Sequence, residues 1–323
     1  MKILIYSYND KIGDGLQKIT FIQKLKSIYP ESHITYTTTK STSLKTTLNS
    51  LIVNCIEEFI EFNDVRSSFF DLFKTNKNFI NKKYDLIIDL QKVVLRTLNL
   101  KRIPHNKFFS ATANFLFSDF KNDNQYLFKN IYIERLYFNI LNIISNKYIN
   151  EIPQINIPNN LISKKKITTE LNKNIGIAPG AGSELRQWDF DKYLEVGKYL
   201  RQKGFNIYFF LGPEEKRYLD VCINNDFMCP EWENDKMISN DITFTMSLAK
   251  NIKLLLCNDG GTSWMFEFAG VKTFKIFGIT NAKKFARPGY SETIQVQDYG
   301  YSEIKDFPVT KYKEILDKFL KRD

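Results

Sequence analysis

The stretch Leu254-Leu255-Leu256-Cys257-Asn258-Asp259-Gly260-Gly261-Thr262-Ser263 decides the expected fold of this chain. Its apolar half predicts a buried strand, and its two glycines predict a tight turn that opens a helix from Thr262 to about Gly270. A helix N-terminus presents unpaired backbone N–H groups, which favour an anionic ligand. A similar turn, Pro179-Gly180-Ala181-Gly182-Ser183, follows the strand pattern Ile175-Gly176-Ile177. Two such turns in one half of the chain predict a ligand that carries phosphate.

Strand-like and helix-like runs alternate around these turns, which is the pattern of parallel α/β sheets. The expected strands are residues 2–6, 33–36, 51–54, 85–90, 174–178, 206–211, 253–258 and 273–277. The expected helices are 16–28, a short one after Gln91, 125–147, 189–202, 214–223, 242–250, 262–270 and 310–320. Between residue 106 and the helix expected from residue 125 we expect a loop.

Residues 151–160 contain Pro153 and Pro158 and predict a linker between two domains. We therefore expect an N-terminal domain of residues 1–155 and a C-terminal domain of residues 156–323. Both are expected to be Rossmann-like and to face each other across a cleft, with ligands at the carboxyl ends of the strands. The last helix, 310–322, is a candidate to pack back on the first domain.

Composition excludes several classes of protein. With 323 residues, 43% of them hydrophobic, the chain is long enough for two cores. No apolar run approaches the roughly 20 residues that span a bilayer, and the chain opens directly on a strand pattern, so we expect a cytoplasmic protein. Four cysteines without metal-ligand spacing and only two histidines predict neither a metal site nor a Ser-His-Asp mechanism.

The net charge is +10, and the first half carries most of it. Residues 1–160 hold 21 Lys and Arg against 14 Asp and Glu, which leaves +7. Such an excess suits an acidic partner, and it equally suits a lysine-rich solvated surface. The Phe-rich stretch 101–120 is compatible with contact with an anionic membrane and with a surface loop. No nucleic-acid recognition motif accompanies the charge, so we expect no nucleic-acid partner.

Four side chains lie where a strand ends, and each has two interpretations. Asp14 is either a general base or a helix N-cap. Arg186 either neutralises a diphosphate or is a surface arginine. Glu215 either accepts hydrogen bonds from a ribose or only stabilises the first turn of a helix. Asp259, because phosphate would repel it, is expected to hold its turn or to meet a sugar hydroxyl. The pattern Asp189-Phe190-Asp191 is interpreted as helix-start acids and not as a metal motif.

The order of these segments resembles glycosyltransferase family 9, the lipopolysaccharide heptosyltransferase family. The resemblance rests on four segments of the chain: Gly13-Asp14 behind the first strand, Tyr84-Asp85-Leu86-Ile87-Ile88-Asp89-Leu90-Gln91, Pro179-Gly180-Ala181 with Arg186-Gln187-Trp188, and Asp259-Gly260-Gly261-Thr262-Ser263-Trp264 with Phe277-Gly278-Ile279-Thr280. It covers nearly the whole chain.

The resemblance implies a GT-B fold and an inverting transfer that needs neither metal nor cofactor. It implies a nucleotide-diphosphate sugar, ADP-heptose, as donor. The implied acceptor is a lipopolysaccharide core or similar glycan, with peripheral contact with the anionic inner membrane. By the same resemblance Asp14 is the base, Gly13, Gln91, Lys92 and Arg96 are acceptor residues, and the donor residues are Gly180, Ala181, Arg186, Glu215, Asp259, Gly260, Gly261, Thr262 and Trp264.

This chain departs from the family pattern at four of these positions. Trp264 stands in place of a histidine, Gly260 in place of a serine, Arg186 in place of a lysine, and Lys92 in place of a glycine. An indole cannot titrate as an imidazole does, so the donor sugar is open. A non-catalytic or altered-specificity relative that binds nucleotide sugars is the main alternative. An epimerase or dehydrogenase is disfavoured because Ile12-Gly13-Asp14-Gly15-Leu16-Gln17 lacks the third glycine of a dinucleotide motif.

Overall fold

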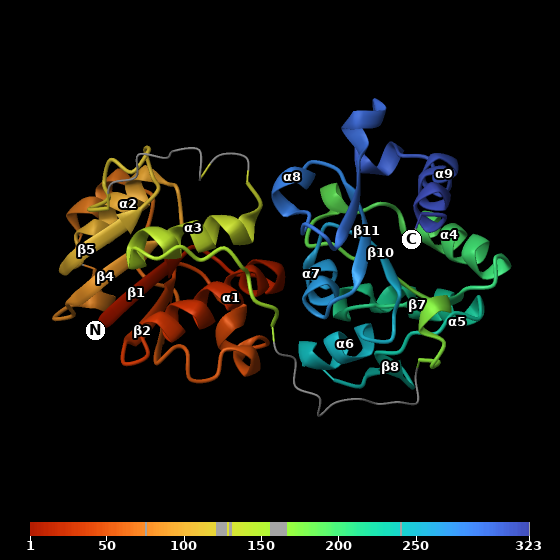
Figure 1. The fold of residues 1–323 in the computed structure, drawn as a ribbon, viewed down its shortest axis with the longest axis horizontal. Helices are drawn as coiled ribbons and strands as arrows, with labels where there is room; N and C mark the ends of the chain where they lie inside the picture. The colour runs from red at the N-terminus through yellow and green to blue at the C-terminus, as the bar shows by residue number, and fades with distance from the viewer. Residues whose placement is uncertain (75, 121–127, 129–130, 156–166, 240, 323) are drawn as a thin grey trace. The chain divides into compact units, whose positions relative to one another are not determined.

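The structure is a computed structural model that describes residues 1–74, 76–120, 128, 131–155, 167–239 and 241–322. The chain divides into two compact units, Met1–Ile155 and Asn156–Asp323. Each unit contains a five-stranded parallel sheet with helices on both faces (Figure 1). The predicted α/β class with two Rossmann-like sheets is confirmed. The expected linker, 151–160, lies partly outside the described residues.

The sheet of the first unit has the order β3-β2-β1-β4-β5. Its strands are β1 Lys2–Ser7, β2 His33–Thr38, β3 Glu58–Ile60, β4 Tyr84–Asp89 and β5 His105–Ser110, and its helices are α1 Ile12–Ile28, α2 Val94–Lys101 and α3 Ile133–Ser145. Helices α1 and α3 pack together on one face, where the rings of Phe21 and Tyr137 are 5.8 Å apart. Helix α2 covers the other face, where Leu100 and Ile103 join a core with Leu4 and Ile87.

The sheet of the second unit has the order β12-β11-β10-β6-β7. Its strands are β6 Asn174–Ala178, β7 Asn206–Phe209, β10 Leu254–Asn258, β11 Lys272–Phe277 and β12 Ser291–Gln295, beside an antiparallel pair, β8 Trp232–Glu233 and β9 Lys236–Met237. The helices are α4 Phe190–Gln202, α5 Leu219–Asn224, α6 Ile242–Ala249, α7 Gly261–Phe268, α8 Ala282–Phe285 and α9 Val309–Leu320.

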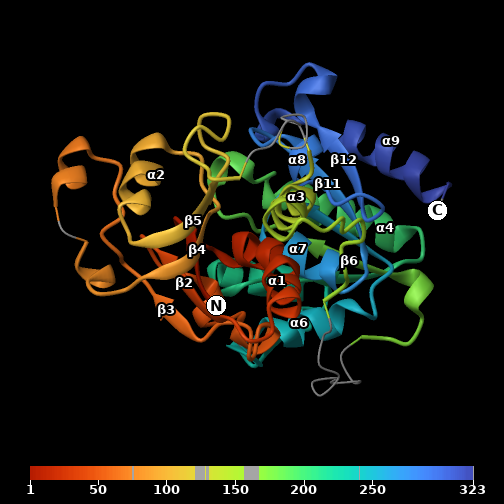
Figure 2. The same cartoon turned by 60° about the vertical axis from the view of Figure 1, so that its left-hand side comes forward.

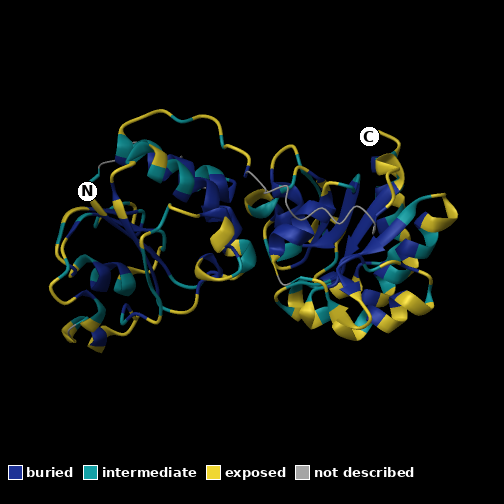
Figure 3. Cartoon of the chain, turned by 90° about the horizontal axis from the view of Figure 1, so that it is seen from below, coloured by how far each residue is buried: buried dark blue, intermediate teal, exposed yellow. Residues whose placement is uncertain are grey.

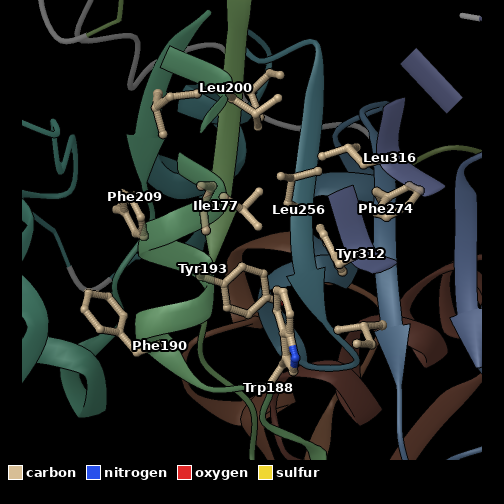
Figure 4. Packing of buried hydrophobic residues seen from close by; sticks show 14 of the residues in the cluster. Ile177, Trp188, Phe190, Tyr193, Leu200, Phe209, Leu256, Phe274, Tyr312 and Leu316 are labelled. Atoms are coloured by element: carbon tan, nitrogen blue, oxygen red, sulfur yellow. The ribbon is translucent and has the colours of Figure 1, made fainter. Parts of the chain in front are cut away.

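Aromatic side chains fill the core between this sheet and α4 and α9 (Figure 4). The Trp188 ring stacks on Tyr312 at 4.5 Å, and Tyr193 meets Trp188 edge-on at 5.0 Å. Both tyrosine rings are fully buried, and burying one large apolar side chain contributes about 1.5–3 kcal/mol. The last helix, a candidate to pack on the first domain, uses its apolar face (Tyr312, Leu316, Phe319) in this core of the second unit.

Most expected elements are present with ends within a few residues, and three expectations are wrong. Residues 51–54 form no strand: a 3-10 helix, η2 Asn49–Leu51, ends there, and Val53 is 61% exposed. The expected helix 125–147 begins at Ile133; residues 125–127 and 129–130 lie outside the described part. The loop expected from residue 106 begins instead with most of strand β5, and strands β3 and β12 were also missed.

The burial pattern explains where helices begin and end. Helix α1 turns Leu16, Ile19 and Ile22 inward at helical spacing, and it ends at Ile28, before Pro30. In Figure 3 the central strands are dark blue, and several helices carry yellow residues on their outer faces, as expected for sheets covered on both sides. Among the helices in the described residues, none has both the length and the apolarity needed to cross a membrane.

Candidate functional site

The site in the second unit lies between two neighbouring strands from which the chain continues to opposite sides of the sheet. Strands β6 and β10 pair in parallel, with Ala178 opposite Cys257 near their carboxyl ends. From β6 the chain continues to β7 on one side, whereas β10 leads to β11 on the other. Such a topological switch point opens a crevice at the carboxyl edge of a parallel sheet. The two glycine turns predicted from the sequence follow these two strands.

The two turns touch each other. A Cβ atom on Gly260 would lie 3.4 Å from the Gly180 carbonyl oxygen and 3.5 Å from the Ala181 Cα atom. Gly260 has an extended backbone (φ −161°), which any residue adopts. Gly261 and Thr262 then open α7 and are half-buried. The structure therefore brings Gly180, Ala181, Gly260, Gly261 and Thr262 to one edge of the sheet.

The Asn258 side chain ties the two turns together. Its Oδ1 atom accepts hydrogen bonds from the Trp188 backbone N–H (3.0 Å) and the Tyr193 hydroxyl (3.1 Å). Its Nδ2 atom donates to the Pro179 carbonyl (2.6 Å). Asn258 is 1% exposed, so these bonds are shielded from water. No role for Asn258 was expected from the sequence, although its place at the strand end beside the glycines was a signal.

Arg186 and Asp259 lie side by side at this edge. Arg186 ends a short 3-10 helix, η8 Glu184–Arg186, and its Nη1 atom is 3.9 Å from Asp259 Oδ2. The Asp259 carboxylate is 6% exposed, whereas the Arg186 side chain is 29% exposed. The buried carboxylate of Asp259 can therefore hold the Arg186 guanidinium, and the exposed side of that guanidinium stays accessible to an anion.

Glu215 lies against the first turn. It belongs to η9 Pro213–Tyr218 after β7, and a Cβ atom on Gly180 would stand 2.5 Å from Glu215 Oε1. Burial and the neighbouring Glu214 raise the pKa of Glu215. Close by, burial raises the pKa of Glu231 to about 7, although a hydrogen bond from the Thr245 hydroxyl opposes the rise. Glu231 has no sequence signature and was missed.

Trp264 is only 2% exposed and packs inside the second unit. Its ring lies 6.0 Å from that of Phe268, and the Lys275 ammonium is 4.8 Å from the indole centre. Lys275 in turn pairs at 2.8 Å with Glu267, and both side chains are fully buried. The indole therefore covers a buried ion pair, a role that the sequence analysis did not foresee. Contact between Trp264 and a donor sugar stays a prediction.

A hollow of about 790 Å³ opens beside these turns at the carboxyl ends of β11 and β12. Gly278 is part of the wall of this hollow. A Cβ atom on Gly278 would lie 3.2 Å from the Leu185 carbonyl oxygen of η8, so the hollow adjoins the segment that carries Arg186. Its lining includes the polar residues Thr280, Asn281, Lys283, Thr293, Gln297, Asp298 and Tyr299 beside apolar ones. Hydroxyl, amide and aromatic groups in this combination suit a ligand rich in hydroxyl groups.

In the first unit, Asp14 is the third residue of α1 and is exposed. The helix begins at Ile12 after Lys11, so the interpretation of Asp14 as an N-cap is wrong. Its backbone carbonyl accepts a hydrogen bond from Lys18 Nζ at 2.9 Å. Gly13 precedes it and is half-buried. Asp14 follows β1, which pairs with β4, so it lies near the switch point of the first sheet.

Asp10 anchors the loop that carries Asp14. Its buried carboxylate accepts hydrogen bonds from Lys18 (2.7 Å), Tyr36 (2.7 Å) and Ser7 (2.8 Å). Burial alone would raise the pKa of Asp10, but the Lys18 ammonium and the hydroxyls outweigh it, so the pKa is lowered. Lys18 Nζ donates hydrogen bonds both to the Asp10 carboxylate and to the Asp14 backbone carbonyl. The Asp10–Lys18 ion pair therefore holds the first turn of α1 in place.

The expected acceptor residues follow β4. The Gln91 N–H donates to Asp89 (2.9 Å), and the Lys92 ammonium, on an exposed residue, donates to the Phe128 carbonyl (3.5 Å). The Arg96 guanidinium lies 3.7 Å above the ring of Tyr8, which follows β1. Tyr8 was missed by the sequence analysis. These residues gather at the carboxyl edge of the first sheet, as Asp14 does.

Comparisons with known proteins agree with this geometry. The sequence model of "Glycosyltransferase family 9 (heptosyltransferase)" matches residues 72–315. No curated protein sequence matched the chain. The glycosyl transferase family 9 structure from Veillonella parvula is 18% identical, with a TM-score of 0.67 and coverage of 100% of this chain and 98% of that one.

Two structures from E. coli are also similar. Heptosyltransferase WaaC with ADP-2-deoxy-2-fluoro heptose has 13% identity and a TM-score of 0.63, covering 98% of this chain and 99% of its own. ADP-heptose lps heptosyltransferase II has 16% identity and a TM-score of 0.63, covering 100% and 99%. The family model matches well over half of the chain, and the architectures agree over its whole length. The chain therefore belongs to glycosyltransferase family 9, and it is a glycosyltransferase of the GT-B fold.

Proposed function

We propose that the protein is an inverting, metal-independent transferase that moves heptose or a related sugar from a nucleotide-diphosphate sugar to a lipopolysaccharide core or similar glycan. ADP-heptose is the favoured donor, because the similar WaaC structure contains ADP-2-deoxy-2-fluoro heptose. One observation carries the proposal: the two glycine turns lie against each other beside Arg186, and hydrogen bonds from the Asn258 side chain hold them together.

The donor diphosphate is proposed to bind these turns. Backbone N–H groups at the start of α7 and the accessible side of Arg186 supply the positive charge, so no metal ion is required. Glu215 is proposed to accept hydrogen bonds from the ribose hydroxyls, since it lies beside Gly180 on the next loop. The hollow at Gly278 is the proposed place for the sugar, because its lining offers hydroxyl and amide groups.

In the proposed reaction Asp14 takes the proton from an acceptor hydroxyl. The acceptor oxygen forms a bond to the anomeric carbon as the bond from that carbon to the diphosphate oxygen breaks, which inverts the anomeric configuration. The leaving diphosphate keeps the electron pair, and Arg186 and the turn amides stabilise its charge. Gly13, Gln91, Lys92 and Arg96 are the proposed acceptor residues.

The alternative, a relative that has altered donor specificity or only binds nucleotide sugars, has one observation in its favour. Trp264 is buried over the Lys275–Glu267 pair, so this position offers no titrating group to a donor sugar.

One experiment separates the candidates. Thermal unfolding with ADP-, GDP-, UDP- and TDP-sugars identifies the nucleotide, because a ligand of the folded state raises its melting temperature. Incubation of the stabilising donor with a truncated lipopolysaccharide core, followed by mass spectrometry, then tests transfer. The proposal expects ADP-sugar stabilisation and one added sugar on the glycan. Stabilisation without any product would favour the binding protein, and no stabilisation by any nucleotide sugar would contradict both.

A further inference from the structure

Leu211, which leads into the loop of Glu215, has both of its backbone polar groups held by two successive side chains. Leu211 lies two residues after β7 and is fully buried. Its N–H donates a hydrogen bond to the Glu231 carboxyl group, and its carbonyl oxygen accepts one from the ring N–H of Trp232 at 2.8 Å. These two side chains therefore fix the backbone at the point where the chain leaves the sheet.

The segment that carries the two side chains is itself anchored to the strand and to α6. The Met228 carbonyl accepts the Phe209 N–H at 2.8 Å, beside β7. The Thr245 hydroxyl of α6 donates to the Glu231 carboxyl group, and α6 packs against α7, the helix of the second glycine turn (Figure 2). Thr245, Glu231 and Trp232 are all buried, so water does not compete for these bonds.

The fixed backbone continues to Glu215, and the two carboxyl groups also interact through their charge. Gly212 follows Leu211, and its carbonyl accepts the Glu215 N–H at 3.1 Å. Burial and the neighbouring Glu215 raise the pKa of Glu231 to about 7, against the hydrogen bonds from the Thr245 hydroxyl and the Leu211 N–H. Glu231 therefore changes its charge in the neutral pH range, within electrostatic reach of the acid proposed to bind the ribose.

The other charged groups nearby come from η9. Burial and Glu214 raise the pKa of Glu215, and the Arg217 guanidinium opposes that rise. The Lys216 ammonium lies 5.8 Å from the centre of the Trp232 ring. The groups that face Glu231 from α6 and from the end of β7 are the hydroxyl and the N–H described above, neither of which titrates.

We propose that Glu231 is a positioning residue of the donor site, which in its protonated form holds the Glu215 loop without adding charge to it. The inference rests on the proposed role of Glu215 and deepens it. Ionisation of Glu231 places a second negative charge behind Glu215, and this charge opposes the binding of a diphosphate. Glu215, in contrast, accepts hydrogen bonds from ribose hydroxyls best when it is ionised. Donor affinity is therefore expected to fall at acid pH through Glu215 and at alkaline pH through Glu231.

The pH profile of ADP-ribose binding tests this assignment by calorimetry. ADP-ribose is the probe because, unlike ADP, it has no terminal phosphate that titrates at about pH 6. Wild-type affinity is expected to fall about tenfold from about pH 6 to about pH 8.5. Glu231→Gln is expected to keep its affinity over this range, because an amide offers the Leu211 N–H an acceptor oxygen and cannot ionise. The loss of affinity at acid pH, which belongs to Glu215, should remain.

Amide hydrogen exchange tests the hold on Leu211 without any donor. Glu231→Ala and Trp232→Phe each remove one bond to Leu211, and both are expected to speed exchange in residues 211–215 about tenfold over wild type at the same pH. Trp232→Phe keeps the carboxyl group and should keep the alkaline loss of affinity, which separates the hold from the charge. Glu233→Gln is the matched control, because it removes an exposed acid from the same hairpin and should change neither measurement.

Two results would overturn the inference while leaving the donor assignment intact. One is a wild-type pH profile of ADP-ribose affinity that is parallel to that of Glu231→Gln. The other is unchanged exchange in residues 211–215 of Glu231→Ala. If neither wild type nor Glu231→Gln binds ADP-ribose at any pH, although exchange responds as expected, the donor assignment itself is wrong and the inference falls with it.

Discussion

Gly180 lies directly against the carboxylate of Glu215, with only 2.5 Å between Glu215 Oε1 and the place where a Cβ atom on residue 180 would stand. A second glycine, Gly212, has the same neighbour at 2.8 Å. Two glycines thus leave room for one half-buried acid beside the turn proposed to hold the donor. The position of this carboxylate depends on the absence of two side chains.

Replacing Gly180 with alanine is expected to displace Glu215 and weaken nucleotide binding. The clashing atoms are at the end of a flexible side chain, so the free energy of unfolding should change by less than about 1 kcal/mol. If Glu215 binds ribose, ADP affinity should fall about tenfold, or about 1.4 kcal/mol. Isothermal titration calorimetry measures the ADP affinity of the variant and of the wild type.

The controls for this prediction are Glu215→Ala and the double variant. The double variant should bind ADP no more weakly than Glu215→Ala alone, because the displaced group is already gone. If the losses of ADP affinity in the two single variants add up in the double variant, the change at Gly180 weakens ADP binding directly and not through Glu215.

Asn258→Ala is expected to destabilise the second unit strongly. The change leaves the Trp188 N–H and the Tyr193 hydroxyl without their buried acceptor, and each loss costs about 1–3 kcal/mol. Urea denaturation should show a fall of about 2–4 kcal/mol in the free energy of unfolding. Asn225→Ala is the matched control, because its side chain makes one exposed bond to the Val221 carbonyl. Equal effects of the two changes would contradict the bracing role.

Asp14→Asn is expected to abolish most transfer and to spare donor binding. Removing a general base costs about 10²–10⁴ in rate, and Asp14 lies in the other unit from the turns proposed to bind the nucleotide. Initial rates and ADP titrations measure the two effects. Asp191→Asn is the control, since it is also an exposed acid in the first turn of a helix. A variant at Asp14 that transfers sugar at the wild-type rate would eliminate it as the base.

The buried Glu231 is expected to make stability fall as pH rises. In the unfolded chain its carboxyl ionises near the ordinary value of 4.5, whereas burial raises the pKa in the folded protein to about 7. Between these values the folded state binds more protons, so the free energy of unfolding decreases with pH, by at most about 3 kcal/mol. Below about pH 4.5 both states are protonated, and the contribution levels off.

Glu231→Gln should remove this contribution. Burial also raises the pKa of Asp89, to about 6, and gives a decline of the same sign, so the informative quantity is the difference between wild type and variant. Urea unfolding at several pH values measures that difference. A wild-type curve parallel to the variant curve from pH 4.5 to 7 would contradict the assigned shift.

Local patterns explain which parts of the fold could be predicted. The turns at Gly180 and Gly260 follow apolar strands and open helices, so their geometry is encoded within about ten residues. Strands β5 and β12 lie at sheet edges and are only partly buried, with polar residues such as Asn106 and Thr293 in place of an apolar run. The apolar run Leu51-Ile52-Val53 predicted a strand that is absent, because an apolar run is also compatible with a 3-10 turn.

Buried charges could not be predicted, because their partners are distant in sequence. Asp10 meets Tyr36 and Thr42, and Glu267 meets Lys275 and Ser291, at separations of 8 to 32 residues along the sequence. A carboxylate acquires its role from such contacts and from burial, neither of which is visible in composition. The same holds for Asn258, whose three partners come from two other segments of its unit.

The three tryptophans of the chain, Trp188, Trp232 and Trp264, all lie in the second unit and are 1%, 9% and 2% exposed. Intrinsic indole emission therefore reports on that unit alone, whereas far-ultraviolet circular dichroism reports on both. Trp188 donates its ring N–H to the Phe307 carbonyl and its backbone N–H to Asn258, which places a natural optical probe immediately behind the two glycine turns. Nucleotide titrations and separate melting of the two halves can thus be followed in the unlabelled protein.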